Sequence, residues 1–351
     1  MTATTARYDT LDAMRGLAAL AVMLDHFTQH SGGPRLFASS FISVDLFFCL
    51  SGFVIAHAYQ QRITDGLSLW GFLRLRVLRL YPAWLMGCAL GWIALVGLVA
   101  TGQTTMTPEQ AVAASILNLL NLPYLGTHVT QIFTARIPAD IFPLNDPGWS
   151  LFFEYCVNLL FFVLITRWSR WPFWLWPALA ALIFFIAVKL FGEGPGWGAS
   201  NFLGGFPRVC YGFLTGALLH HWRDRLPAGP RLPVWTLLLV LTLVLNVPAF
   251  RLHTYYSFFM TLFFVPLAVL LGARAVLPAG SRRQHWARLA GTLSYPLYCV
   301  HFPILFLIFL ALPQATFWQL MVGATGAVLT AALMVQWEKP LARWLGRQLP
   351  A

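Results

Sequence analysis

The stretch LDAMRGLAALAVMLDHF, Leu11 to Phe27, has the length and apolar composition of a helix that enters a bilayer. It nevertheless carries four ionisable residues, Asp12, Arg15, Asp25 and His26. An ionisable group at membrane depth costs at least a few kcal/mol, so such a group is by default a candidate for function. The first apolar segment therefore predicts both a membrane fold and a polar site within it.

The rest of the chain also has the composition of a protein that sits in lipid. Of its 351 residues, 58% are hydrophobic and 10% are charged, whereas soluble domains carry about 25% charged residues. Apolar runs near the roughly 20 residues needed to cross a bilayer recur along the chain, and no polar block of domain size interrupts them. We therefore predict one all-α integral membrane domain over residues 1–351, a bundle of about ten transmembrane helices. The spans are expected at roughly 11–29, 41–60, 80–101, 149–166, 173–191, 202–221, 233–249, 255–273, 292–311 and 316–336.

The basic residues predict the orientation of these spans. The net charge is +11, and most of the basic residues cluster in short gaps between apolar runs, such as 62–79, 167–170, 223–231 and 282–288. This pattern follows the positive-inside rule and places both termini in the cytoplasm, so it argues against a nucleic-acid partner. The long outer segment 102–148 contains an apolar run at 111–122 that is too short to cross. We expect it to form an interfacial or re-entrant helix, although the sequence leaves a crossing open.

The first span places its ionisable residues along one stripe. Asp12 and Arg15 are three residues apart, so they share a helical face and can form an ion pair. His26 lies eleven residues beyond Arg15, close to three full turns and roughly 16 Å further out on the same stripe. It is the side chain there that can exchange a proton near neutral pH, as a general base must. Asp25 projects about 100° away. The alternative is a structural Asp–Arg pair with an interfacial histidine.

The second span, 41–60, adds two candidates. Asp45 lies close to His26 in depth, where it can orient the imidazole or hold a substrate. Ser51 and Gly52, near the middle of the span, favour close approach of another helix. That packing role is favoured over Ser51 as a nucleophile, because no G-x-S-x-G elbow surrounds it.

The inner segment FLRLRVLRLYPAW carries Arg74, Arg76, Arg79 and Tyr81. Arg76 and Arg79 stand at positions i and i+3 on one helical face, where two guanidinium groups suit phosphate oxygens. An ordinary positive-inside anchor explains the arginines equally well. Their place at the start of a span favours binding of an anionic cofactor from the cytoplasm.

Two later segments supply further polar residues at membrane depth. NDPGWSLFFEYCVN contains Trp149 and Glu154, and Arg208 near the outer end of the sixth span is a possible charge partner for Glu154. SYPLYCVHFP contains Tyr298 and His301, and His301 is either an interhelical hydrogen-bonding group or a direct catalytic part. The scattered cysteines, histidines and acids show no metal-ligand spacing, so no metal is expected.

Five segments together resemble the acyltransferase family 3 membrane proteins, the membrane O-acyltransferases of bacterial surface polysaccharides. In chain order they are LDAMRGLAALAVMLDHF, SVDLFFCLSGFVI, LRLRVLRLYPAW, GWSLFFEY and SYPLYCVHFP. The resemblance implies a ten- or eleven-span fold in the bacterial cytoplasmic (inner) membrane. It also implies a cytoplasmic acyl-CoA donor, usually acetyl-CoA. Because the chain ends at Ala351, it is similar to the stand-alone form without an SGNH hydrolase-like domain.

The resemblance also assigns residues. The first-span arginine and histidine of the family fall on Arg15 and His26, and its R-x-x-R motif falls on Arg76 and Arg79. Its S-G-F segment falls on residues 51–53, and its W-S-L-x-x-E pattern falls on residues 149–154. By this resemblance, the arginines hold the CoA phosphates and His26 acts near the acyl group or the acceptor hydroxyl.

The expected reaction is transfer of an acyl group, acetyl by default, from acyl-CoA to a hydroxyl of an extracytoplasmic or membrane-associated carbohydrate. His26 would take the hydroxyl proton, oriented by Asp45 or Asp25, and Arg15 or a tyrosine would stabilise the oxyanion. The alternative is a proton-coupled transporter or flippase of a small anionic or glycan substrate, with Asp12, Arg15, His26 and Glu154 as its relay. The acceptor, the acyl group and the oligomeric state are left open by the sequence.

Overall fold

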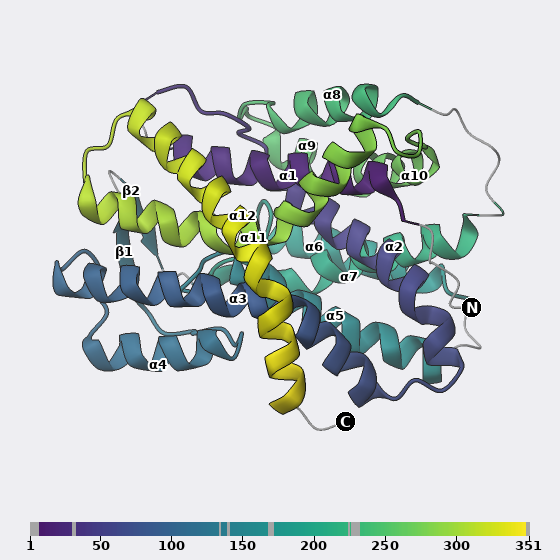
Figure 1. Ribbon diagram of the computed structural model, residues 1–351, viewed down its shortest axis with the longest axis horizontal. Helices are drawn as coiled ribbons and strands as arrows, with labels where there is room; N and C mark the ends of the chain where they lie inside the picture. The colour runs from purple at the N-terminus through teal and green to yellow at the C-terminus, as the bar shows by residue number, and fades with distance from the viewer. Residues whose placement is uncertain are drawn as a thin grey trace.

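The structure is a computed structural model that describes residues 7–29, 33–132, 135–138, 141–167, 172–223, 225 and 232–348. Residues 168–170 and 226–231, in two of the basic gaps, and residues 139 and 140 of the long outer segment lie outside the described residues. The described chain is helical apart from one antiparallel hairpin (Figure 1). Its elements are α1 (Asp9–Thr28), α2 (Ile42–Thr64), α3 (Leu69–Ala100), α4 (Pro108–Leu119), β1 (Val129–Ile132), β2 (Ala135–Pro138), α5 (Gly148–Arg167), α6 (Leu175–Phe191), the 3-10 helix η1 (Ala199–Gly204), α7 (Gly205–Trp222), α8 (Val234–Leu245), α9 (His253–Phe259), the π-helical turn η2 (Met260–Phe264), α10 (Val265–Arg274), α11 (Arg282–Ala311) and α12 (Phe317–Gln348).

Each predicted span coincides with helix. Seven helical stretches among the described residues are long and apolar enough to cross a membrane. They are α2, α3, α5, η1 with α7, α9 with η2 and α10, α11, and α12. α6 and α8 are apolar but shorter, and α1 has 20 residues yet carries the ionisable stripe. The chain is thus a multi-pass helical membrane protein, while the count of ten spans and the side of each terminus stay predictions.

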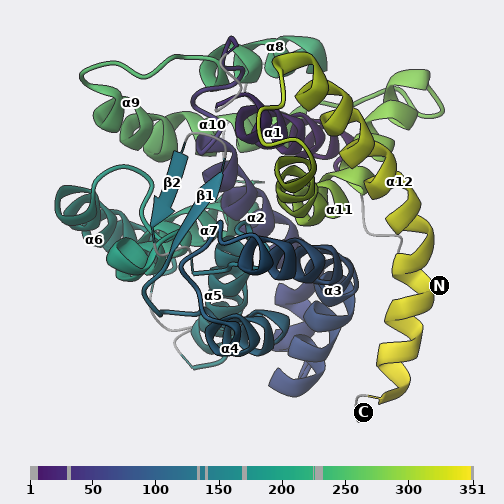
Figure 2. The ribbon, with the colours of Figure 1, turned by 90° about the vertical axis from the view of Figure 1, so that its left-hand side faces the viewer.

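The segment 102–148 contains one helix and one hairpin. α4 covers Pro108–Leu119 and starts with a capping box, in which Thr107 and Gln110 bond each other's backbone amides. Its 12 residues extend only about 18 Å, so α4 is too short to cross a bilayer core of about 30 Å. It lies alongside α3 (Figure 2). The hairpin β1–β2 was not expected, and its β-branched residues at positions 129, 130 and 132 suit a strand.

Two helix packings frame the interior. α1 and α3 pack against α11, which also packs against α12, while α2 packs against α7. A Cβ built at Gly52 would overlap the Phe213 carbonyl, and one at Gly216 would overlap the Cys49 carbonyl. The backbones of α2 and α7 therefore touch, which confirms the close approach predicted from Ser51 and Gly52. The side chain of Ser51 faces the other way, into a cavity between the two packings.

Candidate active site

A cavity of about 220 Å³ lies where α1, α2, α3, α5 and α11 meet. Apolar side chains, largely from α2, form part of its wall, including Phe47, Phe48 and Leu50. The remaining wall is polar and gathers residues from segments far apart in the sequence. The polar lining residues are Arg15, Ser51, Arg76, Arg79, Ser150, Glu154, Ser294, Tyr295 and Tyr298.

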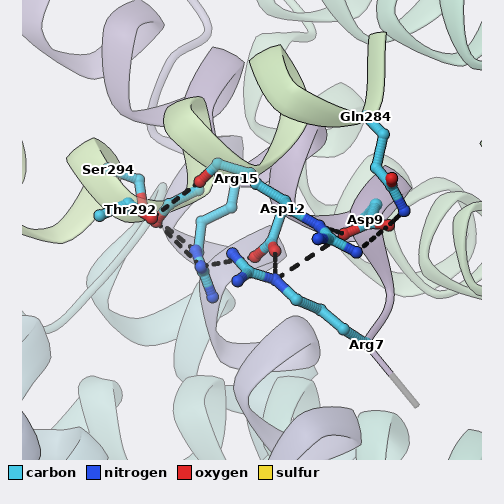
Figure 3. Close-up of polar contacts among 9 residues, drawn as sticks. Arg7, Asp9, Asp12, Arg15, Gln284, Thr292 and Ser294 are labelled. Carbon is cyan, nitrogen blue, oxygen red and sulfur yellow. Dashed lines mark hydrogen bonds and ion pairs between the residues drawn. The ribbon is translucent and has the colours of Figure 1, made fainter. Parts of the chain in front are cut away.

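The polar stripe of α1 faces α11 rather than lipid. Arg15 donates to the Asp12 carboxylate from Nη2 at 2.7 Å, to the Ser294 hydroxyl from Nε at 3.0 Å and to the Gly291 carbonyl from Nη2 at 2.9 Å (Figure 3). Arg7 donates from Nε to the other oxygen of Asp12 at 2.7 Å. Gly291 is required here, because a Cβ at that position would collide with the Asp12 side chain. The local Asp12–Arg15 pair predicted from the sequence is therefore present, and it holds Arg15 at the cavity wall.

Glu154 is the carboxylate of the cavity. It is 7% exposed, and its side-chain contacts with polar groups of the described residues converge on Oε1. The Ser51 hydroxyl donates to this oxygen, as do the Asn158 amide at 3.4 Å and Arg76 Nη2 at 3.5 Å. Arg76 is 8% exposed, and its buried Nε has no hydrogen-bond partner among the described residues. A buried guanidinium with an unused donor beside a cavity is suited to bind an anion or a developing negative charge.

The arginines of α3 divide between two sites. Arg79 lines the cavity, is half-exposed, and lies 3.6 Å from the Glu338 carboxylate of α12. Arg74 instead donates to the Gly346 carbonyl near the end of α12 at 2.7 Å. Tyr81 donates to the Leu119 carbonyl of α4 at 2.8 Å. Neither residue lines the cavity, contrary to the expectation that both belong to the cofactor site, because both face other helices.

His26 and His301 form a pair next to the cavity. His26 Nδ1 is 2.9 Å from His301 Nε2, and the two rings stack at 5.1 Å with an interplanar angle of 16°. The Tyr298 ring lies 5.8 Å from the His301 ring, and its hydroxyl hydrogen-bonds the Ser150 hydroxyl at 2.9 Å in the cavity wall. Tyr298 thus lines the cavity and lies next to His301, whereas neither histidine is among the cavity-lining residues.

Asp45 and Arg208 pair with each other. Arg208 donates from Nε to Oδ1 at 2.7 Å and from Nη2 to Oδ2 at 3.1 Å, and Thr261 donates to Oδ2 at 3.0 Å. The guanidinium also lies over the Trp149 ring at 5.3 Å. The suggested pairing of Arg208 with Glu154 is therefore wrong, because Glu154 faces α2 and α3 at a different depth. Nor does Asp45 orient His26, since both its oxygens serve this pair.

The carboxylate of Asp25 is likewise engaged in hydrogen bonds with residues other than His26. Arg35 donates to its two oxygens at 2.6 and 3.1 Å, and the Ser40 hydroxyl donates at 2.8 Å. The hydrogen bond with Asp25 raises the pKa of Arg35, which lies in the loop after α1. His26 Nδ1 instead meets His301 Nε2, and the described hydrogen bonds of Asp25 and Asp45 go to other residues, so neither candidate aspartate is seen to orient His26.

Ser150, Ser294 and Tyr295 line the cavity but were not singled out as site residues from the sequence. Ser150 is the serine of the W-S-L-x-x-E pattern, and Ser294 lies one turn before Tyr298. The sequence signal that could have identified them is their position within the segments GWSLFFEY and SYPLYCVHFP. Among the described residues, no group of three or more histidines, cysteines or acids is placed to hold a metal ion.

Comparison with known proteins identifies the family. Residues 8–337 match the acyltransferase 3 family, described as an acyltransferase domain. The chain belongs to the acyltransferase 3 family. It is also similar to "Protein 2 in picA locus" of Rhizobium radiobacter, with 36% identity over 172 residues, which cover 46% of this chain and 83% of that relative. Comparison with solved structures gave no match. Membership of the acyltransferase 3 family and the apolar helices make this protein a multi-pass membrane acyltransferase.

Proposed function

We propose that this acyltransferase moves an acyl group, acetyl by default, from cytoplasmic acyl-CoA to a hydroxyl of an extracytoplasmic or membrane-associated carbohydrate. The observation that carries the proposal is the cavity, whose wall combines three arginines with the carboxylate of Glu154 inside a bundle of apolar helices. Asp12 and Glu338 pair with Arg15 and Arg79. The capacity to bind an anion therefore lies in the buried Nε of Arg76, which has no hydrogen-bond partner among the described residues, and in the half-exposed guanidinium of Arg79. We expect the anionic ligand to enter from the cytoplasm, because the predicted orientation of the spans places the arginine-containing end of α3 on that side.

The size of the cavity limits how the donor binds. Pockets that enclose a drug-sized ligand measure about 300–1,000 Å³, and this cavity measures about 220 Å³. It therefore suits the acyl thioester and part of its arm, but not the nucleotide of CoA. The half-exposure of Arg79 supports a role for this residue in binding the phosphates outside the cavity, whereas the buried Arg76 lies beside Glu154.

The reaction forms one C–O bond and breaks one C–S bond. The acceptor oxygen attacks the thioester carbonyl as His26 takes its proton. The tetrahedral oxyanion then collapses with loss of the CoA thiolate, which receives this proton from His26 and leaves as the thiol, so that His26 returns to its neutral form. Arg15, whose Nη1 takes part in none of its three hydrogen bonds, and the Tyr298 hydroxyl are the donors proposed for the oxyanion. His26 is not among the cavity-lining residues, so the proposed reaction requires the acyl group to extend past the cavity wall near Tyr298, whose ring lies 5.8 Å from the His301 ring.

The test follows radiolabelled acetyl from acetyl-CoA into a membrane-glycan extract, together with thiol release, for the purified protein in nanodiscs. Binding of CoA to the same samples is measured separately. We expect His26→Ala to lose label transfer while it keeps CoA binding. Transfer that survives in His26→Ala would keep the acyltransferase but assign the base elsewhere. Absence of CoA binding in the folded wild type would refute the donor and favour the transporter alternative.

A further inference from the structure

The hydrogen bonds of the histidine pair determine which ring nitrogens carry protons. His301 Nδ1 lies 3.1 Å from the Leu297 carbonyl. A carbonyl oxygen only accepts, so His301 Nδ1 must donate. In a neutral imidazole the other nitrogen is then an acceptor, and His301 Nε2 accepts from His26 Nδ1 at 2.9 Å. His26 therefore carries its proton on Nδ1 and its lone pair on Nε2.

We propose that His301 is a positioning residue that holds His26 in the Nδ1–H tautomer and so keeps Nε2 as the basic nitrogen. The inference rests on the proposed function, in which His26 takes the proton of the acceptor hydroxyl. It gives the orienting role, expected from the sequence for an aspartate, to a neutral imidazole on α11.

The surroundings of His301 make it a rigid orienting group. Its side chain is fully buried, at 0% exposure, and the backbone of its own helix fixes one ring nitrogen. The rings of Tyr298 and Phe302 lie 5.8 and 6.2 Å from the His301 ring. The near-parallel stacking of the two imidazoles fixes the plane of His26 as well. A side chain held in this way orients its partner at little entropic cost during the reaction.

The pair also remains bonded through the reaction. When His26 Nε2 takes a proton, Nδ1 keeps its own and continues to donate to His301 Nε2. No proton has to pass to His301, which stays neutral throughout. The interaction thus stabilises the imidazolium that forms and fixes the tautomer before it forms, the two tasks of the third member in a nucleophile–base triad.

The experiment compares two substitutions at one site. His301→Gln keeps an acceptor, because the amide oxygen of glutamine reaches about as far as the imidazole Nε2, whereas His301→Leu removes it. Nitrogen NMR of histidine-labelled protein in nanodiscs, with the His26 signals assigned by their loss in His26→Ala, reports the tautomer without substrate. Acetyl transfer is measured on the same samples, with the retention of CoA binding as the test of folding.

We expect the Nδ1–H tautomer in the wild type and in His301→Gln, and a mixture of tautomers in His301→Leu. In His301→Leu, kcat should fall at least tenfold, part of the roughly 10²- to 10⁴-fold that a general base contributes, with KM for acetyl-CoA unchanged. His301→Gln should recover most of that loss. A wild-type Nε2–H tautomer, or a His301→Leu variant with unaltered tautomer and kcat, would overturn the positioning role alone. If the wild type shows the expected tautomers but transfers no acetyl, the result would instead overturn the proposed function, and with it the role of the histidine pair in catalysis.

Discussion

Substitution of Asp45 by asparagine should destabilise the protein, because it leaves Arg208 without its counter-ion. Both side chains are buried, at 2% and 1% exposure, and two charge-assisted hydrogen bonds of 2.7 and 3.1 Å join them. Loss of one partner of a buried ion pair costs about 3–5 kcal/mol. Asparagine keeps the shape and one acceptor, and Arg208 keeps its bonds to the carbonyls of Gly194 and Phe41. We therefore expect about 3 kcal/mol, the lower end of that range.

The assay uses the buried free cysteines of the protein. Cys49, Cys88 and Cys299 are buried and become reactive toward a thiol dye as the bundle unfolds. The matched control is Asp25→Asn, whose partner Arg35 has a side chain that is 42% exposed. The Asp25 carboxylate is itself buried, at 4% exposure, but water reaches the Arg35 guanidinium, so loss of this carboxylate should cost less than loss of the Asp45 carboxylate, whose partner is fully buried.

The result separates a structural Asp45 from a catalytic one. We expect Asp45→Asn to lower the unfolding temperature by clearly more than Asp25→Asn does, and to lower acetyl transfer only as far as it lowers the folded fraction. An Asp45→Asn variant as stable as the wild type but inactive would refute the reasoning, since it would place the carboxylate in the chemistry.

Three further substitutions test other parts of the structure. Arg76→Lys keeps the charge beside Glu154 but loses the guanidinium donors, so KM for acetyl-CoA should rise about tenfold or more, which corresponds to one charge-assisted hydrogen bond of about 1.5–3 kcal/mol. The control is Arg74→Lys, outside the cavity, which should leave KM unchanged. Equal effects of the two substitutions would contradict the division of the arginines. Glu338→Gln removes a carboxylate that competes for the half-exposed Arg79. In a titration at low salt, CoA should bind up to about fivefold more tightly, within the 0–1 kcal/mol that an exposed ion pair contributes. Weaker binding would show that the carboxylate assists the donor site. Gly52→Ala places a methyl group against the backbone of α7, so the thiol-dye assay should show a lower unfolding temperature. An unchanged unfolding temperature would mean that α2 and α7 can move apart without loss of stability.

The sequence alone predicts the helices and the faces of each. Apolar runs place helices at every predicted span, and the spacing of Asp12, Arg15 and His26 places them on the one stripe that faces α11. The spacing of Arg76 and Arg79 likewise places both on one helical face, which lines the cavity, whereas only the structure shows that Arg74, expected at the same cofactor site, faces α12. These properties depend on the 3.6-residue period within one helix, which the order of residues determines directly.

The partners across helices come only from the tertiary structure. Depth along the membrane allowed Arg208 to face Asp45 or Glu154, and the close packing of α2 on α7 selects Asp45. Glu154 faces Ser51 and Arg76 instead, and His26 meets His301, a residue 275 positions away. A helical period determines which side chains share a face, but the neighbour of that face depends on how the helices pack. Here glycines such as Gly52 and Gly216 set that packing by letting the backbones of α2 and α7 touch.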